Sequence, residues 1–318
     1  MKKEEHIVTS LEEGLSLQKF IASLYGGLSL VEIASLFSSF IKVNELKGDP
    51  SYSLKEGDKI SIELPDELLC KSAETSLSLS SFPSIIIYED DNLLIVNKPK
   101  GLLVQRNIAF GPSVESYSRE YVNSQKEGSS VSSALRLDRE TSGCLVFGKN
   151  PASLSALGKA FMSHEAIKKT YWALVKGSLP TEGEILTPLG KDIKTGLVSP
   201  QPLGSGGKIC KTNYRRIQEF KGFSLLEVRI ATGRTHQIRA HFASISHPVV
   251  GDEKYGDKEL NAKMDKEYGL RGQFLHSKSI AFLSLEEPLA YLNGREFVAP
   301  LPKEEEAMLS SLQESKDN

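Results

Sequence analysis

This chain of 318 residues contains little cysteine and no long apolar run. Cys70, Cys144 and Cys210 are far apart and form no CxxC pair, which argues against a disulfide framework and against a zinc knuckle. No apolar run approaches the length that spans a bilayer, and no apolar segment follows the charged residues at the start. The sequence therefore predicts a protein of the reducing cytoplasm, with no secretory signal and no membrane span.

Sequence signatures of cofactor binding are missing as well. Neither a P-loop nor a dinucleotide fingerprint occurs. Among the histidines, His236 and His241 are five positions apart, whereas two ligands on one helical face need a spacing of four. Structural histidines are commoner than ligand sets. We therefore expect no metal, nucleotide or redox cofactor.

Charge is nearly balanced overall but unevenly distributed. The net charge is −2, whereas residues 207–241 carry eight Lys and Arg against two acids. Local patches rather than totals steer polyanions, so this stretch favours a nucleic-acid partner. The alternative is an ordinary solvated strand face.

A small module is predicted at residues 1–69. Apolar residues recur at helical spacing in two segments, and a short strand, a Glu-Gly-Asp turn and an alternating strand follow. The residues concerned are Leu17, Phe20, Ile21 and Leu24, then Ile33, Leu36 and Phe37, then 41–44, 56–58 and 60–64. This order resembles the S4 RNA-binding domain. Residues 1–65 contain seven basic and ten acidic residues, so weak RNA affinity or a packing role is expected, because phosphate binding needs cations.

The rest of the chain predicts a second, larger domain. Residues 70–84 are Ser-rich and indicate a flexible linker. Residues 85–302 predict an α+β domain on a mostly antiparallel sheet, because strands and helices mix without regular alternation. Residues 303–318 predict an acidic tail with a frayed helix. Within the domain we expect a hairpin at 85–96, helices near 113–122 and 151–163, and strands at 144–147, 171–175, 209–216, 223–230 and 280–285.

The segment Leu135–Gly143, with the sequence LRLDRETSG, is the most informative part of the chain. It places Asp138 between two arginines, just before a turn and an apolar strand. A carboxylate beside fixed positive charge stays ionised and can act as a nucleophile. Taken alone, an Asp before a turn more often caps that turn.

About a hundred residues later, the segment Thr232–His241 (TGRTHQIRAH) is dense in donors suited to phosphate or to a carboxylate. A third segment, Lys169–Trp172, carries Tyr171 on a predicted strand. A fourth, Gly251–Gly256 (GDEKYG), predicts a turn.

Together these segments resemble the RluA-type family of pseudouridine synthases, and most closely its branch that modifies large-subunit ribosomal RNA. The resemblance implies a pseudouridine synthase catalytic domain that isomerises uridine in structured RNA. This reaction breaks the bond from N1 to the sugar, rotates the base and rejoins it through C5. A carboxylate can add to C6 of the uracil or act on the sugar side, and the sequence leaves both routes open.

The resemblance also implies site residues. Asp138 matches the family's nucleophile, Arg234 its ion-pair partner and Tyr171 an aromatic that stacks on the flipped base or moves a proton at C5. Arg136 matches the residue that fills the gap left in the RNA stack. Ile238 is expected beneath the base, although a plain core role is nearly as common. We further expect an RNA contact from Arg139, and from Lys98 and Arg239 either contacts with the RNA backbone or structural pairs.

The predicted function is therefore a pseudouridine synthase that acts without a cofactor as a monomer, on RNA that is most simply 23S ribosomal RNA. The alternatives are a non-catalytic ribosome assembly factor of the same fold and a synthase directed at transfer RNA. A hydrolase of small phosphorylated substrates would instead need a phosphate loop or a metal cluster, and the sequence offers neither.

Overall fold

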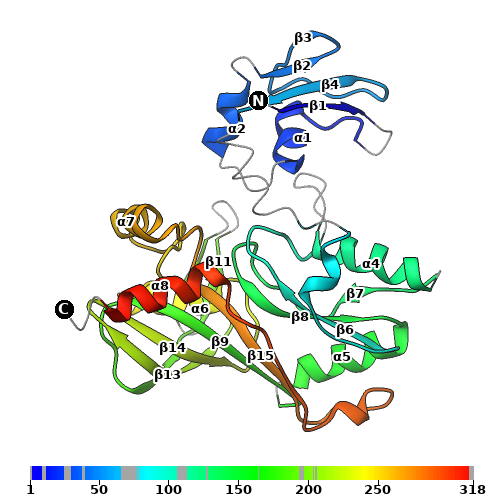
Figure 1. Cartoon of the computed structure of the whole chain (residues 1–318). Helices are drawn as coiled ribbons and strands as arrows, with labels where there is room; N and C mark the ends of the chain where they lie inside the picture. The colour runs from blue at the N-terminus through cyan, green and yellow to red at the C-terminus, as the bar shows by residue number, and fades with distance from the viewer. Residues whose placement is uncertain are drawn as a thin grey trace. The chain divides into compact units, whose positions relative to one another are not determined.

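The computed structural model divides the chain into two compact units (Figure 1). The first comprises Met1–Pro83 with Gly101–Ser124, and the second comprises Ser84–Lys100 with Gln125–Asn318. The structure describes residues 2–8, 12–24, 30–37, 40–65, 77, 79–105, 113–126, 128–163, 165–192, 197–202, 204 and 206–314. Cys70 and most of the predicted linker at 70–84 lie outside the described residues. The division assigns Gly101–Ser124 to the first unit, whereas the sequence suggested one uninterrupted domain from residue 85.

The first unit contains an antiparallel sheet whose described strands follow the order β1-β4-β2-β3. Its elements before residue 82 are β1 (Lys2–Ile7), α1 (Leu17–Leu24), α2 (Leu30–Leu36), β2 (Ile41–Val43), β3 (Leu46–Lys47) and β4 (Lys59–Leu64). The apolar residues at helical spacing form its core, in which Leu17, Ile21 and Leu36 are fully buried. The two helices and the strands β2 and β4 are as predicted. The match of this module to the S4 domain stays a prediction.

Strand β1 was not predicted, because its sequence KKEEHI lacks an apolar alternation. It pairs along one side of β4 from Lys2 with Leu64 to Ile7 with Lys59. Its register is supported by a salt bridge of 2.9 Å between Lys59 and Glu5, both exposed at the surface. Charged side chains on an edge strand hinder pairing with other chains.

The second unit is built on one large sheet. Its described strands form ten-stranded order β10-β13-β14-β9-β15-β8-β6-β5, with β16 on β15 and β7 on β8. Helix α4 (Val114–Gln125) belongs to the first unit apart from its last residue, and η1 (Phe82–Ile85) includes the boundary between the units in the chain. The elements of the second unit are β5 (Ile86–Glu89), β6 (Leu93–Lys98), β7 (Ser132–Ser133), β8 (Ser142–Gly148), α5 (Pro151–Ser163), β9 (Ile167–Lys176), β10 (Glu182–Leu186), β11 (Leu189–Lys191), β12 (Val198–Pro200), β13 (Lys211–Phe220), β14 (Phe223–Ile230), α6 (Gln237–Ser244), α7 (Lys258–Tyr268), β15 (Leu275–Phe282), η2 (Ala290–Leu292), β16 (Glu296–Val298) and α8 (Lys303–Glu314).

This sheet is mostly antiparallel, as the sequence predicted. Between its described strands the one parallel pair joins β15 to β8, where His276 is level with Ser142 and Ser277 with Gly143. The hairpin β11–β12 stands apart as a separate two-stranded sheet. Strand β8 is buried along its whole length, which explains why its sequence SGCLVFG is a continuous small and apolar run.

Gly143 makes the parallel junction possible. Its φ is +108° and a Cβ atom there would lie 2.2 Å from the backbone oxygen of Ser277. Only glycine tolerates both the conformation and the close approach. Ser277 is level with Gly143 on one side and with Tyr171 of β9 on the other. Gly143, Ser277 and Tyr171 thus lie in one row across the sheet. This row connects the start of β8, directly after the LRLDRETS segment, to β9.

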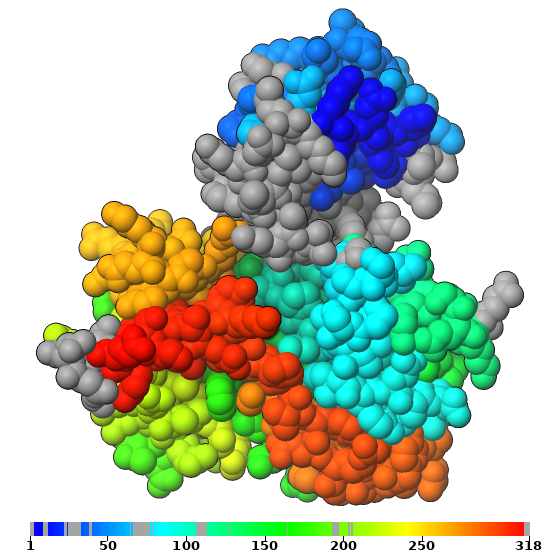
Figure 2. Space-filling model, in the orientation of Figure 1, coloured from blue at the N-terminus to red at the C-terminus, as the bar shows by residue number. Residues whose placement is uncertain are grey.

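The C-terminal segment is a packed helix and not the frayed tail that its acidic composition suggested. Met308 and Leu312 of α8 are buried in a cluster with Leu174 of β9 and Leu225 of β14. The same cluster includes Met264 of α7, and Figure 2 shows α7 and α8 side by side on the surface of the second unit. Three of the four acids of α8 lie in its first turn, where negative charge complements the helix dipole, and its buried apolar residues recur at a spacing of four.

No described helix combines the length and the apolar character that a membrane crossing requires.

Candidate active site

The segment LRLDRETSG lies in the loop between β7 and β8, and its last two residues, Ser142 and Gly143, begin β8. Leu137 is buried, and the backbone N–H of Thr141 donates to the carbonyl of Asp138 at 3.1 Å, which closes a tight turn. The Thr141 hydroxyl accepts from Gln273 Nε2 at 3.1 Å. Among the described residues, the hydrogen-bond donor to the Asp138 side chain is an arginine and not a backbone N–H of the turn. Its carboxylate is 27% exposed and lines a pocket.

The ion-pair partner of Asp138 is Arg239, and not Arg234 as the sequence analysis expected. Arg239 Nη1 donates to Asp138 Oδ2 at 2.8 Å. Arg239 lies in α6, whose Gln237–Phe242 turn is buried, whereas Arg234 lies on the exposed loop before that helix. Both arginines belong to the same short motif. The sequence does not show which of the two side chains is buried.

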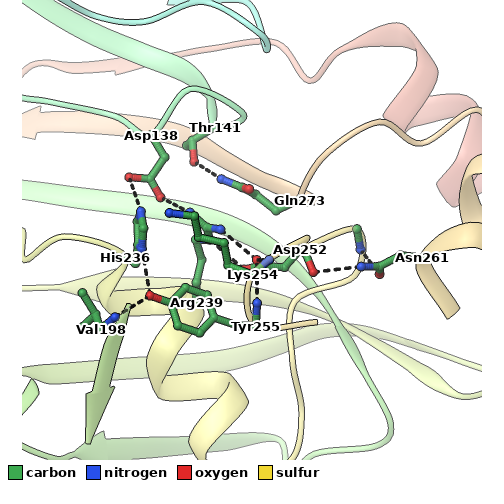
Figure 3. A network of polar contacts seen from close by, with 11 residues as sticks. Asp138, Thr141, Val198, His236, Arg239, Asp252, Lys254, Tyr255, Asn261 and Gln273 are labelled. Carbon is green, nitrogen blue, oxygen red and sulfur yellow. Dashed lines mark hydrogen bonds and ion pairs between the residues drawn. The ribbon is translucent and has the colours of Figure 1, made fainter. Parts of the chain in front are cut away.

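Arg239 is also held by a second carboxylate (Figure 3). Its Nε and Nη2 donate to the two oxygens of Asp252 at 2.7 and 2.8 Å, in a bidentate pair. Asp252 is fully buried, and its Oδ1 also accepts from the backbone N–H groups of Lys254 and Tyr255. Burial lowers the pKa of Arg239, but the hydrogen bonds and charges of Asp252 and Asp138 outweigh it, so the net shift is upward. The guanidinium is a fixed cation between two carboxylates.

The pocket beside Asp138 is small and open to solvent, with a cavity volume of about 60 Å³, below the roughly 300–1,000 Å³ of small-molecule sites. Tyr171, Ile230, Ile238 and Leu275 supply apolar lining. Burial raises the pKa of Tyr171 far above its usual range, against an opposing hydrogen bond with Ser277. The structure thus brings Asp138, Tyr171 and Ile238 together, as expected.

Lys98 is not placed to bind RNA, which corrects the expectation from its sequence. Its side chain has no exposure at all, and its Nζ donates to the carbonyls of Pro99 and Arg139 at 2.8 Å each. Burial lowers the pKa of Lys98 to about 7, with the negative charges of Glu140 and Asp138 opposing that shift. Lys98 is therefore an internal support of the Asp138 loop.

The same correction applies to Arg239. Its side chain is 6% exposed, and its donors are used on Asp138 and Asp252. A phosphate contact would require these bonds to break. Of the predicted RNA contacts, Arg136 and Arg139 remain accessible: Arg136 is exposed at the pocket and Arg139 is partly exposed at the surface. Their roles stay predictions.

The basic stretch at 207–241 is partly neutralised. Five of its eight cations form salt bridges: Lys211 with Glu184, Arg215 and Arg229 with Glu227, Arg216 with Glu219, and Arg239 with Asp138 and Asp252. Glu184 comes from β10, outside the stretch. Pairing across strands places acids beside these bases, so a count along the chain overstates the positive charge of the face.

Sequence analysis missed three residues of this network: Asp252, Tyr255 and His236. The ring of Tyr255 lies 5.3 Å from Arg239 Cζ. His236 Nδ1 is 2.9 Å from the Tyr255 hydroxyl, and its Nε2 is 3.9 Å from Asp138 Oδ1. The segment GDEKYG had been predicted as a turn, and its acid and phenol were the available signal. His236 had been weighed only as a metal ligand.

In the described part of the chain, no three His, Cys, Asp or Glu side chains gather in a way that could hold a metal ion. The arrangement offers one ionised carboxylate, a fixed cation, a phenol and an apolar wall in one pocket. These groups are suited to nucleophilic attack on a flat, partly apolar ring, or to electrostatic stabilisation of charge that develops on it.

Comparisons with known proteins agree with this chemistry. Residues 92–244 match a family model described as RNA pseudouridylate synthase. The chain is 32% identical over 286 residues to ribosomal large subunit pseudouridine synthase C of Vibrio vulnificus, covering 87% of this chain and 85% of the relative. It is 30% identical over 302 residues to ribosomal large subunit pseudouridine synthase D of Zymomonas mobilis, covering 89% and 90%.

A solved structure shares the fold. Human RNA Pseudouridylate Synthase Domain Containing 4 superposes with a TM-score of 0.61 at 20% identity, covering 74% of this chain and 95% of the human chain.

Proposed function

Because this chain belongs to the RNA pseudouridylate synthase family, we propose that it isomerises uridine in large-subunit ribosomal RNA with Asp138 as the nucleophile. The enzyme class follows from the family. The substrate is proposed from the relatives, whose names state that they act on the large ribosomal subunit.

One observation carries the assignment of Asp138. Its Oδ2 is bound by Arg239 at 2.8 Å, while the carboxylate stays 27% exposed in a pocket that Tyr171 and Ile238 also line. A carboxylate that served only to stabilise the fold would have no need of a pocket beside it. The fixed guanidinium stabilises the negative charge without covering Oδ1, so this oxygen is available to the substrate.

The reaction needs no net reagent. The bond from N1 to C1′ of the sugar breaks, the base turns, and a bond from C5 to C1′ forms. The proton on C5 leaves, and N1 gains a proton, so atoms balance. Asp138 assists either by adding to C6 or by acting on the sugar while the base is detached, and both routes use the same oxygen.

Tyr171 and Ile238 are proposed to hold the base. The two side chains are 6% and 5% exposed, so they form the wall and not the rim. A flipped base loses a few kcal/mol of stacking, and contact with the Tyr171 ring offsets part of this loss. The raised pKa of Tyr171 keeps its hydroxyl protonated at neutral pH, so the group acts first as a donor.

Arg136 and Arg234 are proposed to contact the RNA around the pocket, since both are exposed and both line it. Arg136 stands two residues before Asp138 in the same loop, and both residues line the pocket. A guanidinium plane stacks on bases, so Arg136 is suited to the gap that the flipped nucleotide leaves.

The experiment is a tritium-release assay with purified protein. Large-subunit ribosomal RNA and transfer RNA are transcribed with tritium on C5 of uridine, and release is followed over time. We expect release from ribosomal RNA and none above background from transfer RNA. Release from transfer RNA alone would overturn the proposed substrate, and release from neither would overturn the assigned activity. Mapping pseudouridines in cells with and without the protein then locates the target uridines.

A further inference from the structure

His236 has a backbone conformation that calls for an explanation. It precedes α6 with φ 51° and ψ 22°, in the left-handed region, and its side chain makes no capping hydrogen bond to the helix. Residues at this position are usually extended and cap the helix. A left-handed residue other than glycine persists where its surroundings hold it there. The contacts of its ring show what those surroundings are.

Tyr255 fixes which ring nitrogen of His236 carries the proton. The backbone N–H of Val198 donates to the Tyr255 hydroxyl at 2.9 Å. A phenol has a single proton to give, and His236 Nδ1 lies 2.9 Å from the same oxygen. The hydroxyl accepts from Val198, and its one proton is best used by donation to Nδ1, which makes this bond the basis of the inference below. The neutral ring must then carry its proton on Nε2.

That proton faces the nucleophile (Figure 3). Nε2 lies 3.9 Å from Asp138 Oδ1, which is too long for a hydrogen bond but close enough for the N–H dipole to attract the carboxylate. Burial lowers the pKa of His236, while the charge of Asp138 opposes this shift. The other charged groups around the ring are Arg239, Lys254 and Asp252. The ring is therefore neutral at neutral pH.

We propose that His236 is a positioning residue for Asp138, held by Tyr255 as the Nε2–H tautomer so that its N–H orients Oδ1. This inference rests on the proposed function, because it assumes that Asp138 is the nucleophile. Arg239 holds only Oδ2, and the terminal torsion of an aspartate is broad. A second directing group at Oδ1 limits rotation of the carboxylate and presents this oxygen to the pocket.

The hydrogen bonds that link Val198, Tyr255 and His236 begin outside the pocket. Val198 lies in β12 of the small hairpin, and both Val198 and Tyr255 pack in a cluster with Leu189, Cys210 and Ala240. Ala240 follows Arg239 on α6. The hairpin β11–β12 thereby fixes Tyr255, Tyr255 fixes the ring of His236, and the ring faces Asp138.

The first test reads the tautomer directly in the protein without RNA. Nitrogen NMR of protein labelled in its histidine rings, with the His236 signals identified by their loss in His236→Gln, is expected to show a protonated Nε2 and a bare Nδ1. Tyr255→Phe, which removes only the hydroxyl, should shift the ring toward a mixture of tautomers. A proton on Nδ1 in the unmodified protein, or an unchanged tautomer in Tyr255→Phe, would overturn the proposal.

The second test measures single-turnover rates and RNA affinity. Misplacing a reacting group by 1 Å costs on the order of 10²-fold in rate, so Tyr255→Phe and His236→Ala should lose about 10- to 100-fold in rate with RNA affinity unchanged. His236→Gln keeps an N–H donor and should recover part of the loss. Full rates in Tyr255→Phe and His236→Ala, or losses confined to RNA affinity, would refute positioning.

Matched controls lie in the same unit. His247 bonds to the Lys176 carbonyl and Tyr291 donates to Asp90, so His247→Gln and Tyr291→Phe should keep full rates. Equal rate losses in these controls would show that the changes act through stability, which would also refute positioning. An unmodified protein inactive on every RNA would refute the proposed function, while the NMR result would still decide the tautomer.

Discussion

Arg239 Nη1 lies 2.8 Å from Asp138 Oδ2, although 101 positions separate the two residues in the chain. The arginine side chain is 6% exposed and the aspartate side chain 27%. The cation is thus buried below the carboxylate, which is accessible from the pocket. This arrangement engages Oδ2 with Arg239, and it is the reason for proposing Oδ1 as the reacting oxygen.

Asp138→Asn should abolish pseudouridine formation and leave RNA affinity near that of the unmodified protein. The amide keeps the size of the side chain but is not a nucleophile, so a loss of about 10⁴-fold or more is expected. Tritium release and filter binding measure the two quantities on the same RNA. Retained turnover would reject Asp138 as the nucleophile.

Asp252→Asn should lower the rate by about 10- to 100-fold, because an uncharged amide holds the Arg239 guanidinium less firmly and a reacting group is misplaced. RNA affinity should change little, since Asp252 is fully buried. The rate constant is measured at saturating RNA. Asp265→Asn, an exposed change on α7, is the control. An Asp252→Asn protein as fast as this control would show that Asp138 needs no support from Asp252.

The sequence pointed to Asp138 but not to its ion-pair partner. Asp138 stands between two arginines and before a turn and an apolar strand, a pattern visible in the sequence, whereas the choice between Arg234 and Arg239 depends on where α6 begins. That start is set by the left-handed conformation of His236 and by Gln237, whose side chain accepts from Thr232 and from the Arg234 backbone. Contacts of this kind leave no local pattern in the sequence.

Arg136→Ala should weaken RNA binding and the rate together. The guanidinium is exposed beside the pocket, and removing it leaves the gap in the RNA stack unfilled. A loss of about 1–3 kcal/mol in binding is expected for one stacking side chain, and titrations at several salt concentrations measure it. Arg229→Ala removes a cation that Glu227 already neutralises, so it should bind nearly normally. Unchanged RNA affinity and rate in Arg136→Ala would show that this side chain does not fill the gap in the RNA stack.

Tyr171→Phe and Tyr171→Leu should separate the two roles of the phenol. Phenylalanine keeps the ring against the base, so RNA affinity should persist while the rate falls by about 10²-fold, the lower end of proton-transfer contributions. Leucine should lose affinity as well, because the flat ring is gone. Equal rates for Tyr171→Phe and the unmodified protein would exclude the hydroxyl from the reaction.

Lys98→Met should change how stability depends on pH. The folded-state pKa of Lys98 is about 7 and its ordinary value is 10.5, so between these values the unfolded chain binds more protons. The free energy of unfolding therefore rises with pH in this window, by up to about 1.4 kcal/mol per unit. Lys98→Met lacks this dependence, whereas the exposed change Lys159→Met should keep it.

Urea denaturation at about pH 7 and about pH 9 measures this effect, since Lys98 passes from partly charged to neutral across that interval. If the free energy of unfolding changed with pH by the same amount in the unmodified protein and in Lys98→Met, the lowered pKa of Lys98 would be contradicted. The carbonyls of Pro99 and Arg139 lose their donor in this variant, so a uniform loss of stability at both pH values is also expected.

The apolar pattern of the sequence predicted much of the secondary structure. The elements that it did not predict were missed for physical reasons. Helix α5 and strand β14 have the predicted bounds. Helix α7 was missed because few of its residues are apolar; of its residues only Met264 is buried. Its ends are set instead by Asp257, which accepts from two backbone N–H groups, and by Gly269 in the left-handed region. The edge strand β1 is charged, so its sequence has no alternation to detect.

Gly143 has a consequence for how this enzyme can evolve. The row from Gly143 through Ser277 to Tyr171 sets the spacing between the loop of Asp138 and the phenol opposite it. A single added methyl group at Gly143 would collide with the Ser277 backbone and push the two halves of the sheet apart. A change at this position would therefore alter the distance between the Asp138 loop and Tyr171 without replacing any residue that lines the pocket.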